Sequence, residues 1–296
     1  MKLKELFFKG ERAIEVQPQK SDEPEQSTAV AAPEFAVPPK STFFHITHHK
    51  AASQWMLGIF KELFGPVVVK PEYHERHIWD RPIQSGRVYS CCYMGKPEFD
   101  TLEVPETSRA FVIIRDLRDT LVSAYFSLGF THELKVDGMD VFRNILNRLG
   151  PEGALLYLAE GWLVRAARIQ RTWLNSEVPC FKLEDFFSDA PRMLGCMFDQ
   201  GWGLKVPQGQ LDKVAEHHSF FQLSGGRQPG QENVASHYRK GTAGDWRNHF
   251  TPRVAERFEQ LYNDVLLLAG YEQQPGWSQQ LEHSTRESAC APSFTI

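Results

Sequence analysis

A lysine lies in a short polar stretch between an apolar run at residues 43–47 and a helical pattern that begins at Ser53. A strand that turns tightly into a helix directs backbone N–H groups and the positive end of the helix dipole to one point, where they can bind an anion. We expect Lys50 to add a compact positive charge there, and Ser53 to cap the helix and offer its hydroxyl. The stretch lacks the Gly-x-x-x-x-Gly-Lys-Ser/Thr pattern of nucleoside triphosphate loops, which argues against a triphosphate–magnesium site.

A second set of polar residues follows the apolar run at residues 110–114. Arg115 comes directly after this run, Asp116 is placed to cap the next helix, and Ser123 lies about two turns further along that helix. A guanidinium at a strand end and a hydroxyl on the following helix can hold one phosphate from two sides. We interpret Asp119 as a first-turn acid favoured by the helix dipole, not as a metal ligand.

A third set lies in the segment Arg239-Lys240-Gly241, which is followed by Trp246. A flexible glycine beside two cations lets both side chains and exposed backbone N–H groups reach a phosphate. Trp246 can anchor this segment on the core. The segment ends a long connection with several glycines over residues 223–244, and long loops in compact domains are often lids or binding loops.

The elements that must position these residues alternate along the chain. Strands are expected at residues 43–47, 67–70, 87–92, 110–114 and 178–182, and helices at residues 53–64, 120–128, 139–149, 153–175, 190–200, 208–218 and 251–269. Strands separated by helices predict an α/β domain with a central parallel sheet that helices cover on both faces.

The composition indicates one large domain, because the chain has 296 residues and 42% of them are hydrophobic. We expect this domain over residues 41–272, between a flexible N-terminal segment and linker at 1–40 and a flexible C-terminal tail at 273–296. The formal net charge of −4 gives no general electrostatic reason to bind nucleic acid or an acidic membrane. No signal peptide or membrane span is expected. Five cysteines without metal-site spacing indicate the reduced thiols of a cytoplasmic protein.

The three polar segments, in this order, resemble those of the cytosolic-type sulfotransferases, which share a P-loop-like α/β fold and use 3′-phosphoadenosine 5′-phosphosulfate (PAPS) as donor. The family's 5′-phosphosulfate loop is Pro-Lys-Ser-Gly-Thr-Thr-Trp. The resemblance implies that the matching residues bind the donor here: Lys50, Ala51, Ala52, Ser53, Gln54 and Trp55. Because Ala52 replaces a glycine, we expect the turn either to keep negative φ or to leave slightly more room for the donor.

The resemblance also implies which residues bind the 3′-phosphate of PAPS. Arg115 and Ser123 match the family's pair of phosphate ligands, and Arg239-Lys240-Gly241 matches the family's Arg-Lys-Gly segment, which closes over the same phosphate. The strand end at residues 181–185 resembles the family's Tyr-Glu-Asp segment near the adenine, with Leu183 in place of the tyrosine. No metal is implied.

The catalytic base is not evident in the expected place. The family uses the histidine of a Lys-Thr-His segment, and the nearest equivalent stretch, residues 87–93, contains no histidine. Loops at the strand ends of such sheets face the ligand crevice, so the best-placed candidates are His74, Glu75 and His77 in the loop at residues 72–80. Further candidates are His48, His49, His132 and Glu133, and each is equally well explained as a surface or packing residue.

The function that the resemblance implies is sulfuryl transfer from PAPS to a hydroxyl, or to an amine, of a small acceptor by in-line displacement. Lys50 would stabilise the leaving phosphate, His74 or His77 would take the acceptor's proton, and 3′,5′-adenosine bisphosphate (PAP) would be the product. Two alternatives stay open: a nucleotide kinase or other phosphoryl transferase, and a non-catalytic scaffold that binds PAP. Aromatic residues that suit an acceptor pocket, and suit a core equally well, are Phe126, Phe130, Trp79, Tyr93, Phe220 and Phe221. The sequence predicts neither the acceptor nor the oligomeric state.

Overall fold

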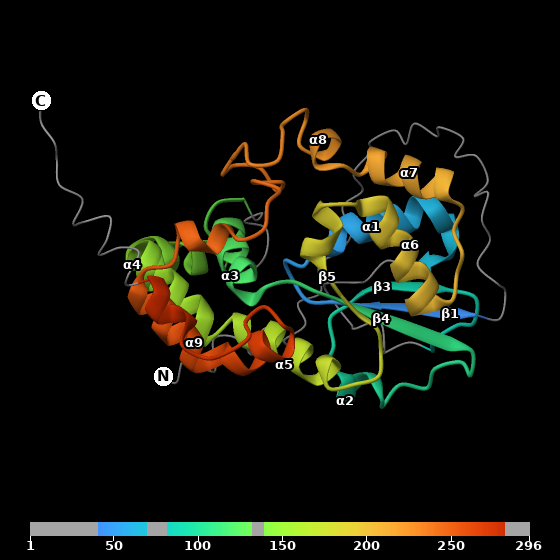
Figure 1. The fold of residues 1–296 in the computed structure, drawn as a ribbon, viewed down its shortest axis with the longest axis horizontal. Coiled ribbons are helices and arrows are strands. Elements are labelled where there is room, and N and C mark those ends of the chain that lie inside the picture. Colours follow the sequence, from blue (N-terminus) through green and yellow to red (C-terminus); the bar gives the residue numbers. More distant parts are fainter. Residues whose placement is uncertain (1–40, 70–81, 132–138, 282–296) are drawn as a thin grey trace, which may run out of the picture.

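A parallel sheet lies at the centre of the structure, a computed structural model that describes residues 41–69, 82–131 and 139–281 (Figure 1). The sheet has five strands in the order β2-β3-β1-β4-β5, and every pairing is parallel. The strands are β1 (Thr42–Ile46), β2 (Val68–Val69), β3 (Val88–Cys92), β4 (Ser108–Ile114) and β5 (Cys180–Lys182). This arrangement confirms the predicted α/β class.

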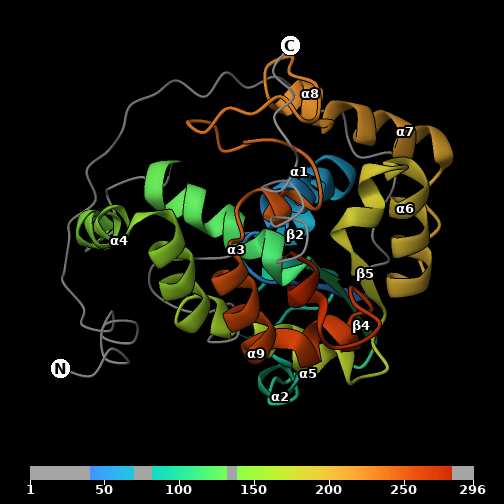
Figure 2. The same cartoon turned by 60° about the vertical axis from the view of Figure 1, so that its left-hand side comes forward.

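Helices cover both faces of the sheet. The α-helices are α1 (Ser53–Phe64), α2 (Lys96–Phe99), α3 (Leu117–Phe126), α4 (Met139–Glu160), α5 (Leu163–Leu174), α6 (Ala190–Met197), α7 (Gln208–His217), α8 (Phe220–Leu223) and α9 (Pro252–Leu268). Short 3₁₀ or π segments are η2 (Gly65–Val67), η4 (Ser127–Thr131), η5 (Leu183–Phe187), η6 (Phe198–Trp202) and η7 (Asp245–Asn248). Helices α1, α6 and α7 lie on one face, α2 and α5 lie on the other, and α3, α4 and α9 form a group beside the sheet (Figures 1 and 2). Within the described ranges, no helix has the length and apolar character needed to cross a membrane.

Both faces of β1 are buried because its side chains alternate between two cores. Phe43 packs with Phe60 and Trp202 on the side of α1 and α6. Phe44 packs on the opposite side with Tyr89 and with residues of α5. A strand covered on both faces is apolar at nearly every position, which is why this run was recognisable in the sequence.

The helix predicted at residues 153–175 is divided in the structure. Helix α4 ends at Glu160 and α5 begins at Leu163, so the prediction of one helix here is wrong. The apolar spacing continues across the break because both helices bury one face in the same core. The predicted gap at residues 150–152 is a kink inside α4, where Gly150 has a left-handed φ of 67° before Pro151.

His45 is a fully buried polar residue of β1. His45 Nδ1 accepts hydrogen bonds from the amide of Cys91 (3.4 Å) and from the hydroxyl of Ser90 (3.1 Å). Its ring packs against Phe60 and Phe111, and complete burial lowers its pKa to about 3. The imidazole is therefore neutral in the folded protein, while in the unfolded chain it titrates near its usual pKa of about 6.5.

This difference predicts a loss of stability in mild acid. Below about pH 6.5 the unfolded chain binds a proton at His45 that the folded protein does not, so the free energy of unfolding falls by about 2 kcal/mol between pH 7.5 and pH 5.0. Urea unfolding at the two pH values should show that this decrease is smaller by that amount in a His45→Gln variant. The exposed His217, replaced in the same way, is the control and should leave the decrease as it is. An undiminished decrease in His45→Gln would contradict this assignment.

Candidate functional site

The turn between β1 and α1 has a left-handed backbone at two residues. Lys50 has φ 69° and Ala52 has φ 55°, so the first of the two expected alternatives, a turn with negative φ, is excluded, and the second, slightly more room for the donor, stays a prediction. A left-handed conformation costs a residue with a side chain roughly 1–2 kcal/mol, and it persists only where surrounding contacts hold it. Ala51, between the two, is fully buried, so the turn is packed into the protein and not loose at its surface.

Hydrogen bonds from neighbouring elements hold this turn. The amide of Met56 donates to the carbonyl of Ala52 (3.1 Å). From the end of β4, Arg115 Nη1 donates to the carbonyl of Lys50 (2.9 Å). The carbonyls of both left-handed residues therefore have partners, which is the physical reason that the strained turn is stable.

The start of α1 differs from the expectation that Ser53 caps it. Ala52 is the N-cap residue and makes no side-chain cap. Ser53 is the first helical residue, and its hydroxyl accepts a hydrogen bond from Tyr93 Oη (2.7 Å). The N-cap residue contributes no side-chain hydrogen bond to the first turn of α1, and the amides and the dipole of this helix end point to where an anion would bind.

The other two residues of the expected phosphosulfate loop lie further along α1. Gln54 is exposed. Trp55 is half-buried, and its Nε1 donates to the carbonyl of His218 (2.8 Å) while its ring meets the edge of Phe186. These contacts hold the indole in one orientation beside the turn.

Lys50 is half-buried in the ligand-free protein. Desolvation, and then the charge of Arg115, lower the pKa of its ammonium to about 8. Within the described ranges the ammonium makes no hydrogen bond and no ion pair. An anion placed beside it would remove this unfavourable electrostatic situation and raise the pKa again.

Arg115 lies at the centre of the charged groups of this region. Its positive charge lowers the pKa of Lys50 and of His48, and it favours the ionised forms of Asp119 and Glu184. The prediction that Lys50 and Arg115 serve one site from two strand ends is consistent with the 2.9 Å hydrogen bond between them.

Glu184 fixes the end of β4. Its Oε1 accepts from the amide of Asp116 (2.9 Å), and its Oε2 accepts from the hydroxyl of Tyr271 (2.7 Å). Burial raises the pKa of this carboxyl in spite of these bonds. Asp116 accepts from the amide of Arg118 (2.8 Å), which confirms that it caps α3.

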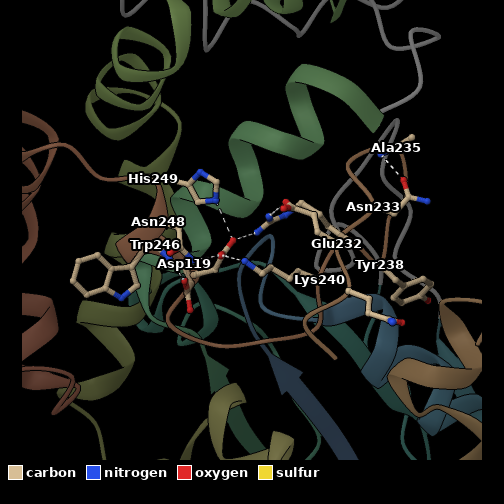
Figure 3. A network of polar contacts seen from close by, with 12 residues as sticks. Asp119, Glu232, Asn233, Ala235, Tyr238, Lys240, Trp246, Asn248 and His249 are labelled. Atoms are coloured by element: carbon tan, nitrogen blue, oxygen red, sulfur yellow. Dashed lines mark hydrogen bonds and ion pairs between the residues drawn. The ribbon is translucent and has the colours of Figure 1, made fainter. Parts of the chain in front are cut away.

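Asp119 connects α3 to the segment that contains the third polar motif. Its two carboxylate oxygens accept from the amides of Gly244 (2.6 Å) and Trp246 (2.9 Å), and the side chain is almost completely buried (Figure 3). The interpretation of Asp119 as a first-turn acid was therefore incomplete. Its partners lie 125 and 127 residues further along the chain, so no local pattern signals them. Trp246 is buried, as predicted, and Arg118 lies over its ring (4.1 Å).

Arg239 and Lys240 both pair with Asp245, a buried carboxylate that His249 also contacts (Figure 3). Burial alone would raise the pKa of Asp245, but the hydrogen bonds from Lys240 and Arg239 outweigh it and hold the pKa well below its usual range. The guanidinium of Arg239 also lies over the ring of Phe126, 4.2 Å from its centroid. Arg239 also pairs with Glu232, so two carboxylates balance the charges of the two cations.

The contact with Phe126 brings the second and third motifs together. Ser123 and Phe126 are three residues apart on α3 and so share one face of that helix. The segment after α8 runs from α7 towards α3 (Figures 1 and 2), and its Arg239 contacts this face at Phe126. Gly241 has φ 68°, and a Cβ at this position would lie 2.4 Å from the ring of Phe220, so only glycine fits without a shift.

Of the candidates for a catalytic base, the described residues include His48 and His49. His74, Glu75, His77, His132 and Glu133 lie outside these residues. His48 is buried, and burial lowers its pKa to about 4, so it is not open to an acceptor. His49 is exposed and stacks on Tyr93 (4.1 Å). In the stretch at residues 87–93, where the resemblance led us to expect the base, Cys92 is buried and the pKa of its thiol is raised, which excludes it as a base near neutral pH.

The chain is similar in sequence to known proteins. Residues 106–273, more than half of the 296-residue chain, match the family model of the sulfotransferase domain. Human Sulfotransferase 1C2 is 27% identical over 244 residues, which are 73% of this chain and 80% of that protein. Mouse Sulfotransferase 2A2 is 30% identical over 176 residues, which are 54% of this chain and 56% of that protein.

The solved structure of mouse sulfotransferase SULT7A1, complexed with PAP, superposes with a TM-score of 0.52 at 15% identity and covers 82% of this chain and 89% of that one. This likeness concerns the fold alone. The matched domain includes Arg115, Ser123 and the Arg239-Lys240-Gly241 segment, while the Lys50 turn precedes it. On the match over more than half of its length, the chain belongs to the sulfotransferase domain family.

Proposed function

We propose that this protein transfers a sulfuryl group from PAPS to a hydroxyl, or less readily an amine, of a small acceptor. The observation that carries the proposal is the 2.9 Å hydrogen bond from Arg115 to the carbonyl of Lys50. It joins the residue expected at the phosphosulfate to the residue expected at the 3′-phosphate. Membership of the sulfotransferase domain family supports the same reaction class.

At the phosphosulfate end, the amides of the turn and of the first turn of α1 would bind the donor's 5′-phosphate, together with Lys50 and Ser53. In-line displacement lengthens the bond between sulfur and the bridging oxygen, so negative charge grows on the leaving phosphate. The ammonium of Lys50 stabilises this charge more in the transition state than in the ground state, which is what accelerates the reaction. Ser53 already accepts a hydrogen bond from Tyr93, so its own proton is directed to another acceptor.

At the other end, Arg115, Ser123, Arg239, Lys240 and Gly241 would hold the 3′-phosphate. Arg239 and Lys240 are paired with Asp245 in the ligand-free protein, so the phosphate would have to share these cations with the carboxylate. A phosphate carries up to two negative charges and several acceptor oxygens, which makes it favourable for the two cations to bind the phosphate as well as the carboxylate. His74 or His77 would take the proton of the acceptor, and no metal ion is required.

The first prediction of this proposal concerns nucleotide selectivity. PAP should raise the melting temperature more than ADP, or ATP with magnesium, at equal concentration, because only PAP presents a 3′-phosphate to Arg115 and Lys240. A ligand at 100 times its dissociation constant stabilises a protein by about 2.7 kcal/mol, so the shift is measurable. Stronger stabilisation by ADP or ATP would favour a phosphoryl transferase instead. PAP binding without consumption of PAPS across a panel of phenols and alcohols would favour the scaffold.

The second prediction concerns Lys50. Its replacement by alanine should lower the rate of PAP release from PAPS by two to three orders of magnitude, because the growing charge loses its counter-charge, while PAP binding stays measurable. The exposed Lys61, on the helix that follows this turn, is the control and should be replaceable by alanine without loss.

The lowered pKa of Lys50 also predicts how the rate depends on pH. The ammonium is charged below about pH 8, so kcat/KM for PAPS should fall as the pH rises through this value. In Lys50→Arg the falling limb should disappear, because a guanidinium keeps its charge. Full activity of Lys50→Ala would refute the assigned role.

The third prediction uses a matched pair of glycines. Gly241→Ala should weaken PAP binding, because the new Cβ would lie 2.4 Å from the ring of Phe220 and would push the segment away from the phosphate. Gly225 has a similar φ of 75°, but a Cβ added there would meet no atom within 4 Å. Gly225→Ala should therefore show the backbone strain without the displacement. Equal PAP affinity in both variants, measured by calorimetry, would contradict the role of Gly241.

A further inference from the structure

A buried glutamine of α5 lies behind the donor site. Gln170 has no exposed surface. Its Nε2 donates one hydrogen bond to the carbonyl of Arg115 (2.7 Å) and a second to Nε2 of His48 (2.7 Å). One amide group therefore contacts both the residue that follows β4 and a residue of the turn after β1.

The contacts of His48 define which nitrogen carries its proton. Nδ1 faces the carbonyl of His49 at 2.9 Å, so Nδ1 must donate there. Nε2 of the neutral ring is then the acceptor for Gln170. Burial keeps the ring neutral, with a pKa lowered to about 4. The amide of Gln170 is oriented without ambiguity, because both of its partners are acceptors.

Together with the backbone of the strained turn, these hydrogen bonds form a closed cycle, called the ring below. The carbonyl of Lys50 accepts from the side chain of Arg115, and the carbonyl of Arg115 accepts from Gln170. Gln170 donates to His48, and His48 donates to the carbonyl of His49. Two consecutive carbonyls, those of His49 and Lys50, are thus held by hydrogen bonds that connect the turn to β4 and α5, and the second belongs to a left-handed residue.

We propose that Gln170 and His48 are positioning residues, which hold Lys50 and Arg115 in one geometry and so couple the phosphosulfate end of the donor site to its 3′-phosphate end. The inference rests on the proposed function. Neither residue needs to touch the donor. The ring acts on the backbone of the turn, where a small rotation at Lys50 would move the ammonium relative to the guanidinium.

Packing alone does not explain an amide at this position. Gln170 lies on α5 next to Ile169 and three residues before Trp173, and both of these residues are buried in an apolar core. Its Oε1 is buried and has no hydrogen-bond partner within the described residues, which is unfavourable for stability. A methionine would fill a similar volume without an unpaired oxygen, so the two bonds donated by Nε2 are the contribution that only the amide makes.

The test measures PAP affinity by calorimetry in Gln170→Met, which keeps the length of the side chain and removes its donors. We expect the dissociation constant to increase about tenfold, the effect of losing one to two positioned hydrogen bonds. The matched control is Ile169→Val, a change at the neighbouring buried position. It should lower the melting temperature without changing PAP affinity.

A double-mutant cycle separates positioning from general stability. In an Arg115→Met background the ring is already open at the carbonyl of Lys50, so Gln170→Met should weaken PAP binding by much less than it does alone. A purely structural glutamine would give effects that add. Additive effects, or unchanged affinity in the single variant, would overturn the proposal.

Variants of His48 break the same ring at another point, so the test survives if Gln170→Met fails to fold. His48→Leu should weaken PAP binding by a similar factor. His48→Gln can offer its Oε1 to Gln170 in place of Nε2 and should recover most of the affinity. Normal affinity of His48→Leu, or a His48→Gln variant that binds as weakly as His48→Leu, would overturn the role of His48. Absence of PAP binding to the unaltered protein would instead refute the proposed function itself.

Discussion

The hydrogen bond from Arg115 to the carbonyl of Lys50 depends on the register of two neighbouring parallel strands. In the pairing of β1 with β4, Ile46 lies beside Val112, so both strands end at the same edge of the sheet. Arg115 follows β4 directly, and the turn with Lys50 follows β1. A shift of the register by one residue would turn the side chains of β1 to the opposite faces of the sheet. It would also move Lys50 by one residue along the strand direction relative to Arg115, and the hydrogen bond between them would be lost.

The N-terminal turn of α3 transmits this geometry to the rest of the chain. Asp119 accepts the amides of Gly244 and Trp246, and Arg118 lies between Trp246 and Trp277 while it pairs with Asp116. Buried charges are tolerated in a protein only where hydrogen bonds and counter-charges satisfy them. The charged groups at the start of α3 meet both conditions, so they can be buried. Asp119 then attaches the segment with Arg239 and Lys240 to this helix.

The parts that could be predicted from the sequence are those that local patterns determine. The strands and the bounds of α1 follow from periodicity and from apolar runs, and Asp116 is a cap because its partner amide is two residues away. The role of Asp119 and the bond between Gln170 and His48 could not be predicted, because their partners lie more than 120 residues away in the chain. The cap at Ser53 was wrong for the same reason, since Tyr93 engages its hydroxyl across 40 residues.

Two residues of the turn before α1, Lys50 and Ala52, have side chains although their backbone is left-handed. Within the described ranges, the non-glycine residues with positive φ are Lys50, Ala52 and Cys91, and each of them flanks the same turn or the end of β3. Glycine would adopt this conformation at lower cost, but it would also visit many others. Alanine has fewer accessible backbone conformations than glycine. In the proposed arrangement Arg115, Gln170 and His48 already hold the turn, so its backbone would order little further when a ligand binds. A turn organised before the ligand arrives binds a developing charge more strongly than one that must reorganise. The strain at Ala52 is therefore compatible with catalysis and does not by itself indicate a degraded site.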